Sequence, residues 1–208
     1  MQAQKNGARF LILAASLLAL VSPVAAQNGG GSIKLRVAPQ GNEVRYRVRE
    51  QLMNIDFPGD AIGKTSKIEG EISVDAKGVV QDGSRFVIDL ASLTSDKEMR
   101  DNFIRRRTLQ TEQHPSATFV PTELKNLKFP LPKSGEVKFQ MVGNLTVRNV
   151  TKPVTWDIVG KVENGGLSGE AKTTFKFADF DLEKPRVRSV LSVEDDIGLE
   201  YTFALVPR

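Results

Sequence analysis

Apolar and polar residues alternate along most of this 208-residue chain, and this period of two constrains the fold more than any other feature. The clearest runs lie at 44–48, 137–147, 167–177 and 197–205. Successive side chains of a strand point to opposite faces of a sheet, so each run predicts a strand with one apolar and one polar side. Such strands, joined by short turns, predict an all-β fold in which an antiparallel sheet curls into a barrel or a sandwich.

A short turn signal separates two of these runs. Asn164-Gly165-Gly166 predicts a hairpin turn, because asparagine and glycine adopt the left-handed backbone that tight hairpins need. We therefore expect the strands on either side of this turn to be antiparallel neighbours.

One segment departs from the period of two. Residues 95–98 (Ser-Asp-Lys-Glu) have the pattern of a capping box, with Ser95 as the residue ahead of a helix. Met99 and Phe103 then lie four residues apart, on one helical face. We expect one short helix over 96–107, and a lone helix in an all-β chain is expected to cover one end of a barrel.

The first 26 residues have the pattern of a secretory signal peptide. Lys5 and Arg9 precede an apolar run at 10–21, and small residues lead up to Ala26. The run is shorter than the roughly 20 residues that span a bilayer, which disfavours the alternative of an N-terminal anchor helix. We expect cleavage after Ala26 and a secreted or periplasmic protein with no transmembrane span after cleavage.

The remaining chain is expected to form one domain. Residues 27–42 begin with the polar, glycine-rich stretch QNGGGS and predict a flexible lead-in. The alternating runs fill residues 43–208, a length that suits a single domain with its own hydrophobic core. The organisation expected is thus a signal peptide (1–26), a lead-in (27–42) and a barrel domain (43–208).

The composition excludes several kinds of chemistry. The chain has no cysteine, which rules out disulfides, thiolate metal sites and thiol nucleophiles, and His114 is its only histidine. The formal net charge of +4 is too mild for a dedicated nucleic-acid-binding protein. No phosphate-binding glycine loop or nucleophile elbow stands out. We expect no catalytic residue, no metal site and no cofactor, and therefore not an enzyme.

The apolar faces are the candidate ligand-binding surface. They include small residues, Gly70, Gly143, Gly169 and Ala171, which are expected to open a tunnel along the barrel. The alternative is a solid core in which large and small side chains interdigitate. An apolar tunnel would hold a lipid with about 0.8 kcal/mol per buried methylene group and without any charged motif. The large residues expected to line it are Phe86, Ile88, Phe139, Met141, Trp156, Ile158, Phe175, Phe177, Tyr201 and Phe203.

Several motifs resemble those of one known family. Residues 100–102 (RDN) and 114–119 (HPSATF) resemble the RD…YP-x-x-TF stretch of the YceI-like family. Residues 143–154 (GNLTVRNVTKPV) resemble its G-x-L-T-(I/V)-x-G-V-T-(K/R)-P-V hairpin, and residues 92–94 (SLT) resemble its S-L-x-T motif. The resemblance extends from about residue 44 to the C-terminus.

Two positions depart from the family pattern. His114 stands where the family usually has tyrosine, and Asn149 stands where it usually has glycine. Asparagine tolerates a left-handed backbone better than most residues, so we expect Asn149 to provide it in this turn.

The resemblance implies a lipocalin-like, extended antiparallel barrel of about eight strands with an apolar interior. It also implies an isoprenoid-type lipid as the ligand, polyprenyl or quinone-like, in a secreted or periplasmic setting. The family offers no established catalytic residues to carry over. The resemblance thus favours a lipid carrier or store, with a non-catalytic interaction or structural module whose barrel is solidly packed as the alternative. The sequence does not decide the oligomeric state, and a homodimer is one possibility.

A basic cluster lies on the expected helix. Arg105, Arg106 and Arg107 close the helix, and Arg100 lies about one turn earlier. At the mouth of a barrel, Arg100, Arg105 and Arg106 would be placed to hold a phosphate head group through forked hydrogen bonds. The alternative is a solvated helix end, where cations suit the helix dipole.

Overall fold

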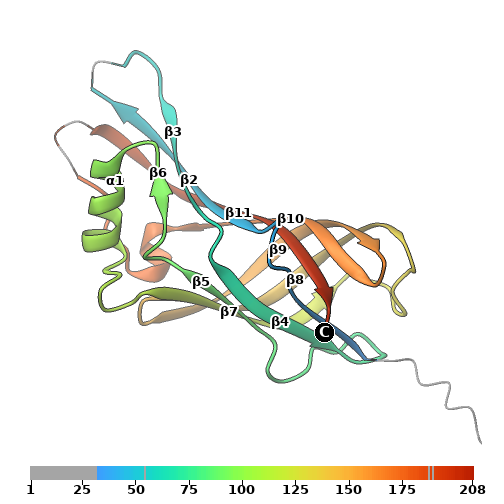
Figure 1. Ribbon diagram of the computed structural model, residues 1–208. Coiled ribbons are helices and arrows are strands. Elements are labelled where there is room, and N and C mark those ends of the chain that lie inside the picture. Colours follow the sequence, from blue (N-terminus) through green and yellow to red (C-terminus); the bar gives the residue numbers. More distant parts are fainter. Residues whose placement is uncertain (1–31, 54, 187, 189) are drawn as a thin grey trace, which may run out of the picture.

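The strands of this protein form one antiparallel sheet that closes into a barrel. A computed structural model describes residues 32–53, 55–186, 188 and 190–208. The barrel strands are β1 (Ile33–Val37), β4 (Ile68–Val74), β5 (Arg85–Asp89), β7 (Ser116–Lys125), β8 (Gly135–Val147), β9 (Val150–Glu163), β10 (Gly166–Lys176) and β11 (Val190–Pro207). They neighbour one another in this order, and the ring closes because β1 pairs with both β4 and β11 (Figure 1). The predicted eight-stranded antiparallel barrel is confirmed.

The N-terminal predictions have different outcomes. The signal peptide predicted for 1–26, and residues 27–31 of the predicted lead-in, lie outside the described residues. The lead-in prediction is wrong for Ile33–Val37, which form β1 and complete the ring. Its apolar residues alternate with Lys34 and Arg36, so this strand follows the same period of two as the others.

Asn42 holds the bend that follows β1. Its side-chain oxygen accepts hydrogen bonds from the Tyr201 hydroxyl (2.9 Å) and from the Ala204 backbone N–H (3.0 Å). Its amide donates to the carbonyl of Ala38 at 2.8 Å. Because Asn42 is buried, these bonds satisfy polar groups that water does not reach, and they fasten the bend to β11.

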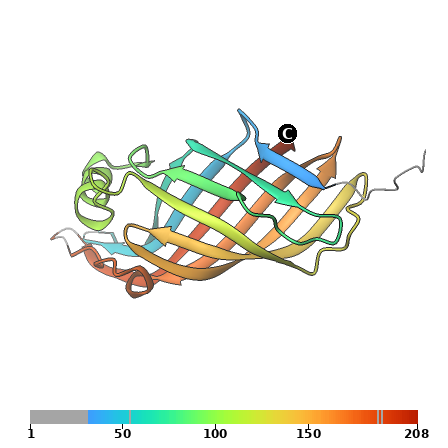
Figure 2. The same cartoon turned by 90° about the horizontal axis from the view of Figure 1, so that it is seen from below.

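Three further strands extend the sheet beyond the ring. They are β2 (Glu43–Leu52), β3 (Gly59–Thr65) and β6 (Thr94–Ser95). The end of β11 pairs with β1, whereas its earlier part pairs with β2, which continues to β3 and β6. The β2–β3 hairpin therefore leaves the ring, at the end of the barrel where helix α1 (Glu98–Phe103) lies (Figures 1 and 2).

The helix predicted over 96–107 is present, although it begins differently. It consists of α1 and a π-helical turn, η1 (Ile104–Thr108). The predicted capping box does not form, because the residue ahead of α1 is Lys97 and no side chain caps the first turn. Ser95 instead donates its hydroxyl to the Asp101 carboxylate at 2.6 Å and its backbone N–H to the same oxygen at 2.8 Å.

The hairpin turns show one correct and one wrong prediction. Asn164 and Gly165 join β9 to β10 with positive φ angles of 52° and 76°, as predicted. In the β8–β9 turn the left-handed residue is Arg148 (φ 54°) rather than Asn149. The Arg148 guanidinium donates to the side chain of Gln110 at 3.2 Å, a contact that helps to hold this turn beside η1.

Candidate functional site

A cavity of about 900 Å³ occupies the inside of the barrel. Its walls are inward-facing side chains of most barrel strands and of β2, together with α1, η1 and the connection between β2 and β3. Sites for drug-sized ligands measure about 300–1,000 Å³, so the volume is that of a site for one sizeable molecule. The lining is almost entirely apolar, which suits a hydrophobic ligand.

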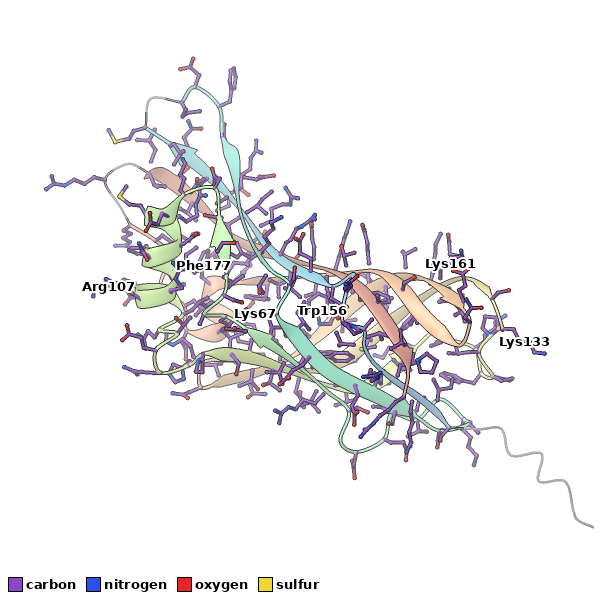
Figure 3. All side chains as sticks on the ribbon, viewed as in Figure 1. Lys67, Arg107, Lys133, Trp156, Lys161 and Phe177 are labelled. Carbon is purple, nitrogen blue, oxygen red and sulfur yellow. The ribbon has the colours of Figure 1, made fainter. Side chains whose placement is uncertain are left out.

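The large residues predicted to face the interior all line this cavity. They come from β5, β8, β9, β10 and β11, with Phe177 in the short 3-10 helix η2 (Phe177–Phe180) instead of on a strand. Figure 3 shows Trp156 near the middle of the barrel, between Phe177 on the helix side and Lys161 at the other end. The full set is Phe86, Ile88, Phe139, Met141, Trp156, Ile158, Phe175, Phe177, Tyr201 and Phe203.

The glycines do not open the cavity, so that part of the prediction is wrong. A Cβ atom on Gly70 or Gly169 would lie 2.2 Å from a backbone carbonyl of the neighbouring strand. At Gly143 the space is filled by the Phe119 ring, whose nearest atom would lie 2.5 Å from an added Cβ. Ala171 does line the cavity, as predicted. The glycines thus allow close packing between strands and rings.

The end of the barrel opposite α1 is packed solid. Leu35, Ile72, Val74 and Val162 are each 4% exposed and do not belong to the cavity lining. They come from β1 and β4, which pair with each other, and from β9, and all four belong to the buried core. The cavity is therefore blind at this end and faces outward beside α1.

Three buried polar atoms in the cavity wall have no hydrogen-bond partner among the described residues. They are the Tyr46 hydroxyl, the Thr108 hydroxyl and the indole N–H of Trp156. Burial raises the pKa of Tyr46, so its hydroxyl remains a hydrogen-bond donor. An unsatisfied buried donor costs about 1–3 kcal/mol, and a ligand with an acceptor atom would offset this cost. Of these three residues, the sequence pattern predicted only Trp156 as part of the lining.

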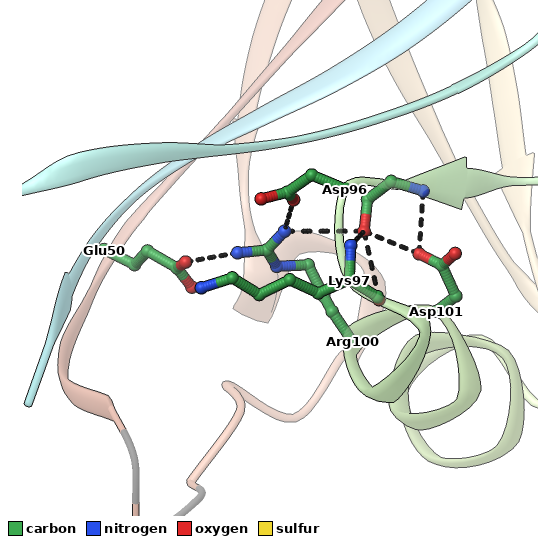
Figure 4. A network of polar contacts seen from close by, with 6 residues as sticks. Glu50, Asp96, Lys97, Arg100 and Asp101 are labelled. Carbon is green, nitrogen blue, oxygen red and sulfur yellow. Dashed lines mark hydrogen bonds and ion pairs between the residues drawn. The ribbon is translucent and has the colours of Figure 1, made fainter.

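A network of ion pairs lies at the mouth of the cavity. The Arg100 guanidinium contacts the carboxylates of Glu50 and Asp96 and donates a longer bond to the Ser95 hydroxyl at 3.4 Å (Figure 4). The side chains of Arg100 and Glu50 are 13% and 11% exposed, and both residues line the cavity. Burial alone would lower the pKa of Arg100, but the attraction of Glu50 and Asp96 outweighs it, so its pKa is raised.

This network changes what Arg100 offers to a ligand. Its single positive charge faces two carboxylates, so an anionic head group here would meet Glu50 and Asp96 as well as the guanidinium. Arg105 does not line the cavity, because its guanidinium donates to the Leu93 carbonyl at 2.8 Å. Arg106 is exposed and also lies outside the lining. Of the three predicted head-group arginines, the structure brings only Arg100 to the cavity.

Two further observations concern the described residues alone. None of their helices is both long and apolar enough to cross a membrane. Among the same residues, no three acidic or histidine side chains come together as a metal-binding group.

The fold and its cavity define a class of protein: a closed antiparallel barrel with a blind apolar interior that opens beside a short helix. The chain matches the family described as YceI-like domain over residues 35–205, which is most of its length. This protein belongs to the YceI-like family, as the motifs of the β8–β9 hairpin and the segment after α1 indicated.

Curated relatives support this assignment. The chain is 31% identical over 127 residues to a UPF0312 protein of Pectobacterium carotovorum, a match covering 58% of this chain and 62% of the relative. It is 30% identical over 145 residues to a UPF0312 protein of Yersinia pestis, covering 64% of this chain and 71% of the relative. The match thus spans less than two thirds of the Pectobacterium protein.

Solved structures share the fold. A polyisoprenoid binding domain from Saccharophagus degradans, implicated in plant cell wall breakdown, superposes with a TM-score of 0.64 at 11% identity, over 84% of this chain and 98% of that domain. BcnA of Burkholderia cenocepacia gives a TM-score of 0.60 at 18% identity, over 82% and 99% of the two chains. A YceI protein of Campylobacter jejuni gives 0.55 at 19% identity, over 76% and 90%.

Proposed function

We propose that this protein binds a single long, isoprenoid-type lipid in its barrel and acts as a carrier or store, without catalysis. The observation that carries the proposal is the apolar cavity of about 900 Å³. Each buried methylene group of a ligand contributes about 0.8 kcal/mol, so a long chain binds tightly without a charged anchor. The Saccharophagus neighbour, named a polyisoprenoid binding domain, supports the same ligand class.

The cavity favours this proposal over a solidly packed interaction module. In such a module the residues around Trp156 would fill the interior, as the buried residues Leu35, Ile72 and Val162 do at the closed end. Here the same inward-facing positions surround open volume instead.

We propose further that the bound lipid has an uncharged polar head, as a quinone or a polyprenol has. The free hydroxyls of Tyr46 and Thr108, at the α1 end of the cavity, suit an acceptor oxygen of such a head. The carboxylates of Glu50 and Asp96 compensate the charge of Arg100, so this guanidinium does not by itself favour a phosphate. The head-group role predicted for Arg100 is therefore restated as a positioning role, in which Arg100 holds Glu50 and α1 at the cavity mouth.

Export is part of the proposal and depends on residues 1–26, outside the described part of the chain. The charged, apolar and small-residue segments of this stretch support a secreted or periplasmic protein. N-terminal sequencing of the protein recovered from a periplasmic or extracellular fraction tests it, with residue 27 as the expected first residue.

The ligand is tested by purifying the full-length gene product without detergent, extracting it with organic solvent and analysing the extract by mass spectrometry. We expect about one isoprenoid-type lipid per protein chain. If the extract contains none, and the stripped protein takes up neither a long-chain quinone nor a polyprenol in a titration, the proposal is wrong. Preferential uptake of a polyprenyl phosphate would overturn the uncharged head while leaving the lipid-binding role.

A further inference from the structure

The exposed apolar side chains of this protein gather at the mouth of the cavity. Of the eight large apolar residues exposed in the described part of the chain, five lie at the α1 end; we call them the apolar rim. The rim consists of Met53, Ile55, Phe57, Met99 and Leu191. Phe57 and Met99 are the most exposed, at 78% and 81%. Apolar side chains scattered singly are ordinary on a soluble protein, whereas a cluster of this kind marks a contact surface.

The rim comes from three segments that meet at one end of the molecule. Met53, Ile55 and Phe57 belong to the connection between β2 and β3, Met99 is on α1, and Leu191 is on the first residues of β11. The pairing of Val190 with Leu52 brings the start of β11 to the β2–β3 hairpin. Figures 1 and 2 both show the hairpin and α1 at the same end of the barrel.

The rim is continuous with the interior. Met53, Ile55 and Met99 are exposed and also line the cavity. An apolar path therefore leads from the outer surface into the barrel. A lipid chain that moves along this path from another apolar phase avoids contact between its methylene groups and water.

Basic side chains surround the rim. Lys97 and Arg188 stand at the cavity mouth, and Arg106, Arg107 and Arg186 lie on the same segments. All five are exposed, and none of them forms an ion pair within the described part of the chain. The ion pairs of this region are formed by two other cations, Arg100 and Lys184.

The exposed acids on these segments that lack an ion pair are as numerous, namely Asp56, Glu98, Asp181, Glu183 and Glu194. None of these acids lines the cavity mouth, where the charged residues are Glu50, Lys97, Arg100 and Arg188, so the mouth itself is net positive.

We infer that the apolar rim docks on the surface of a lipid bilayer that contains anionic lipids, with the cavity mouth facing the membrane. Exposed apolar side chains enter the interfacial region while basic side chains contact anionic head groups, and both contributions strengthen binding. This orientation would let a lipid pass between bilayer and barrel. The use of this docking, transfer of a lipid, rests on the proposed function, but binding to vesicles is measured independently of lipid uptake.

Vesicle sedimentation tests the docking. We expect the wild-type protein to sediment with vesicles of phosphatidylcholine and phosphatidylglycerol, and less with phosphatidylcholine alone. The triple variant Phe57→Ser, Met99→Ser, Leu191→Ser should lower the partition coefficient by about tenfold or more, because it removes the most exposed apolar side chains. The matched control Val79→Ser, Val159→Ser replaces exposed valines outside the rim and should change nothing.

A charge variant tests the electrostatic part. Arg106→Gln with Arg107→Gln should measurably weaken the preference for anionic vesicles, whereas Lys133→Gln should preserve it. Figure 3 shows Arg107 beside α1 and Lys133 at the far end of the barrel. Equal losses from both variants would contradict a docking surface at α1.

A third measurement locates the contact directly. The chain has no cysteine, so Phe57→Cys, Met99→Cys and Val79→Cys each provide one attachment site for an environment-sensitive dye. Vesicles should shift the dye emission to shorter wavelength at positions 57 and 99 but not at position 79. Wild-type protein that stays in the supernatant with both vesicle types, or dyes that respond alike at all three positions, would overturn the inference.

Failure of the docking inference and failure of the ligand proposal give different results. Uptake of a long-chain quinone or a polyprenol by the stripped protein, followed by Trp156 fluorescence without vesicles, reports on the cavity alone. Uptake without vesicle binding overturns only the docking. Vesicle binding without uptake supports the docking and overturns the ligand proposal.

Discussion

The two ends of the barrel show how one sheet produces both a solid core and a cavity. At the closed end, β1 bridges β4 and β11, and Leu35, Ile72 and Val162 fill the interior. At the α1 end, β11 pairs with β2 instead of β1, and the β2–β3 hairpin extends out of the ring. The hairpin and α1 then form the cavity mouth.

The difference lies in strand pairing more than in side-chain size. Large apolar residues line the barrel at both ends, but the strands at the closed end form a complete ring around them. The bend at Asn42, where one strand ends and the next begins, marks the change of partner along β11. In this fold the cavity forms at the end of the barrel where β1 no longer closes the ring and β11 pairs with β2.

The largest expected effect compares two isoleucines, one from each region. Ile72 and Ile158 are 4% and 5% exposed, but only Ile158 lines the cavity. Ile72→Ala should lower the free energy of unfolding by about 4 kcal/mol and Ile158→Ala by about 2 kcal/mol, because a side chain beside open volume has fewer contacts to lose. Urea unfolding measures both, and equal losses would mean that the two regions are packed alike.

The second effect concerns the ion pair at the mouth. Glu50→Gln removes one of two carboxylates from a largely buried arginine and should lower stability by about 2 kcal/mol. It should also raise the affinity for a polyprenyl phosphate about tenfold, because Arg100 then faces one carboxylate instead of two. Thermal unfolding and lipid titration measure the two changes.

Glu71→Gln is the control for this variant. Glu71 pairs with Arg208 at the closed end, where both side chains are more exposed, so it should cost under about 1 kcal/mol and leave lipid preference unchanged. A matching change in preference would show that Arg100 has no special role.

A smaller effect is expected from narrowing the cavity. Ala171 lines the cavity from β10, and Ala171→Phe should weaken lipid binding by about tenfold without lowering the melting temperature. Lys172→Phe adds the same ring on the exposed, outward face of this strand and should bind lipid normally. Equal affinities for the two variants would place the ligand elsewhere.

The smallest effect lies on the outer face of the β2–β3 hairpin. Hydrogen bonds from Arg47 (2.8 Å) and Arg49 (3.3 Å) lower the pKa of Asp60. A carboxyl whose pKa is lower in the folded state stabilises at neutral pH, and that stability is lost as the pH falls through the folded-state pKa. Asp60→Asn should therefore cost under about 1 kcal/mol near neutral pH and nothing in strong acid. Urea titrations at both pH values check this, and a pH-independent difference would refute it.

The alternating pattern predicted most of the strands and the inward-facing residues. It did so because successive side chains of a strand point to opposite faces of the sheet, so the period of two gives the direction of each side chain. β1 was missed because it has only five residues beside a glycine-rich stretch. β3 was missed because its sequence, GDAIGKT, contains a single large apolar residue. Both short strands are held by their neighbours, and such pairing is not visible in a local sequence window.

The polar contacts at the cavity mouth were harder to predict than the apolar residues of the cavity wall. Arg100 stood out in the sequence, but Glu50 lies 50 residues earlier, and only the fold brings the two together. The free hydroxyls of Tyr46 and Thr108 gave no signal, since any inward-facing position of a strand or helix can hold such a group. The sequence therefore indicated Arg100 as a phosphate ligand, whereas in the structure Glu50 and Asp96 compensate its charge.

Trp156 offers the most direct measurement of whether the barrel holds a lipid. It is the only tryptophan of the chain and lines the cavity, so its fluorescence reports on occupancy. Titration of the delipidated protein with a long-chain quinone should quench this emission saturably at about one molecule per chain, and Ala171→Phe should require about tenfold more ligand. Emission that does not change in the wild type, or that changes equally in Ala171→Phe, would contradict binding inside the barrel.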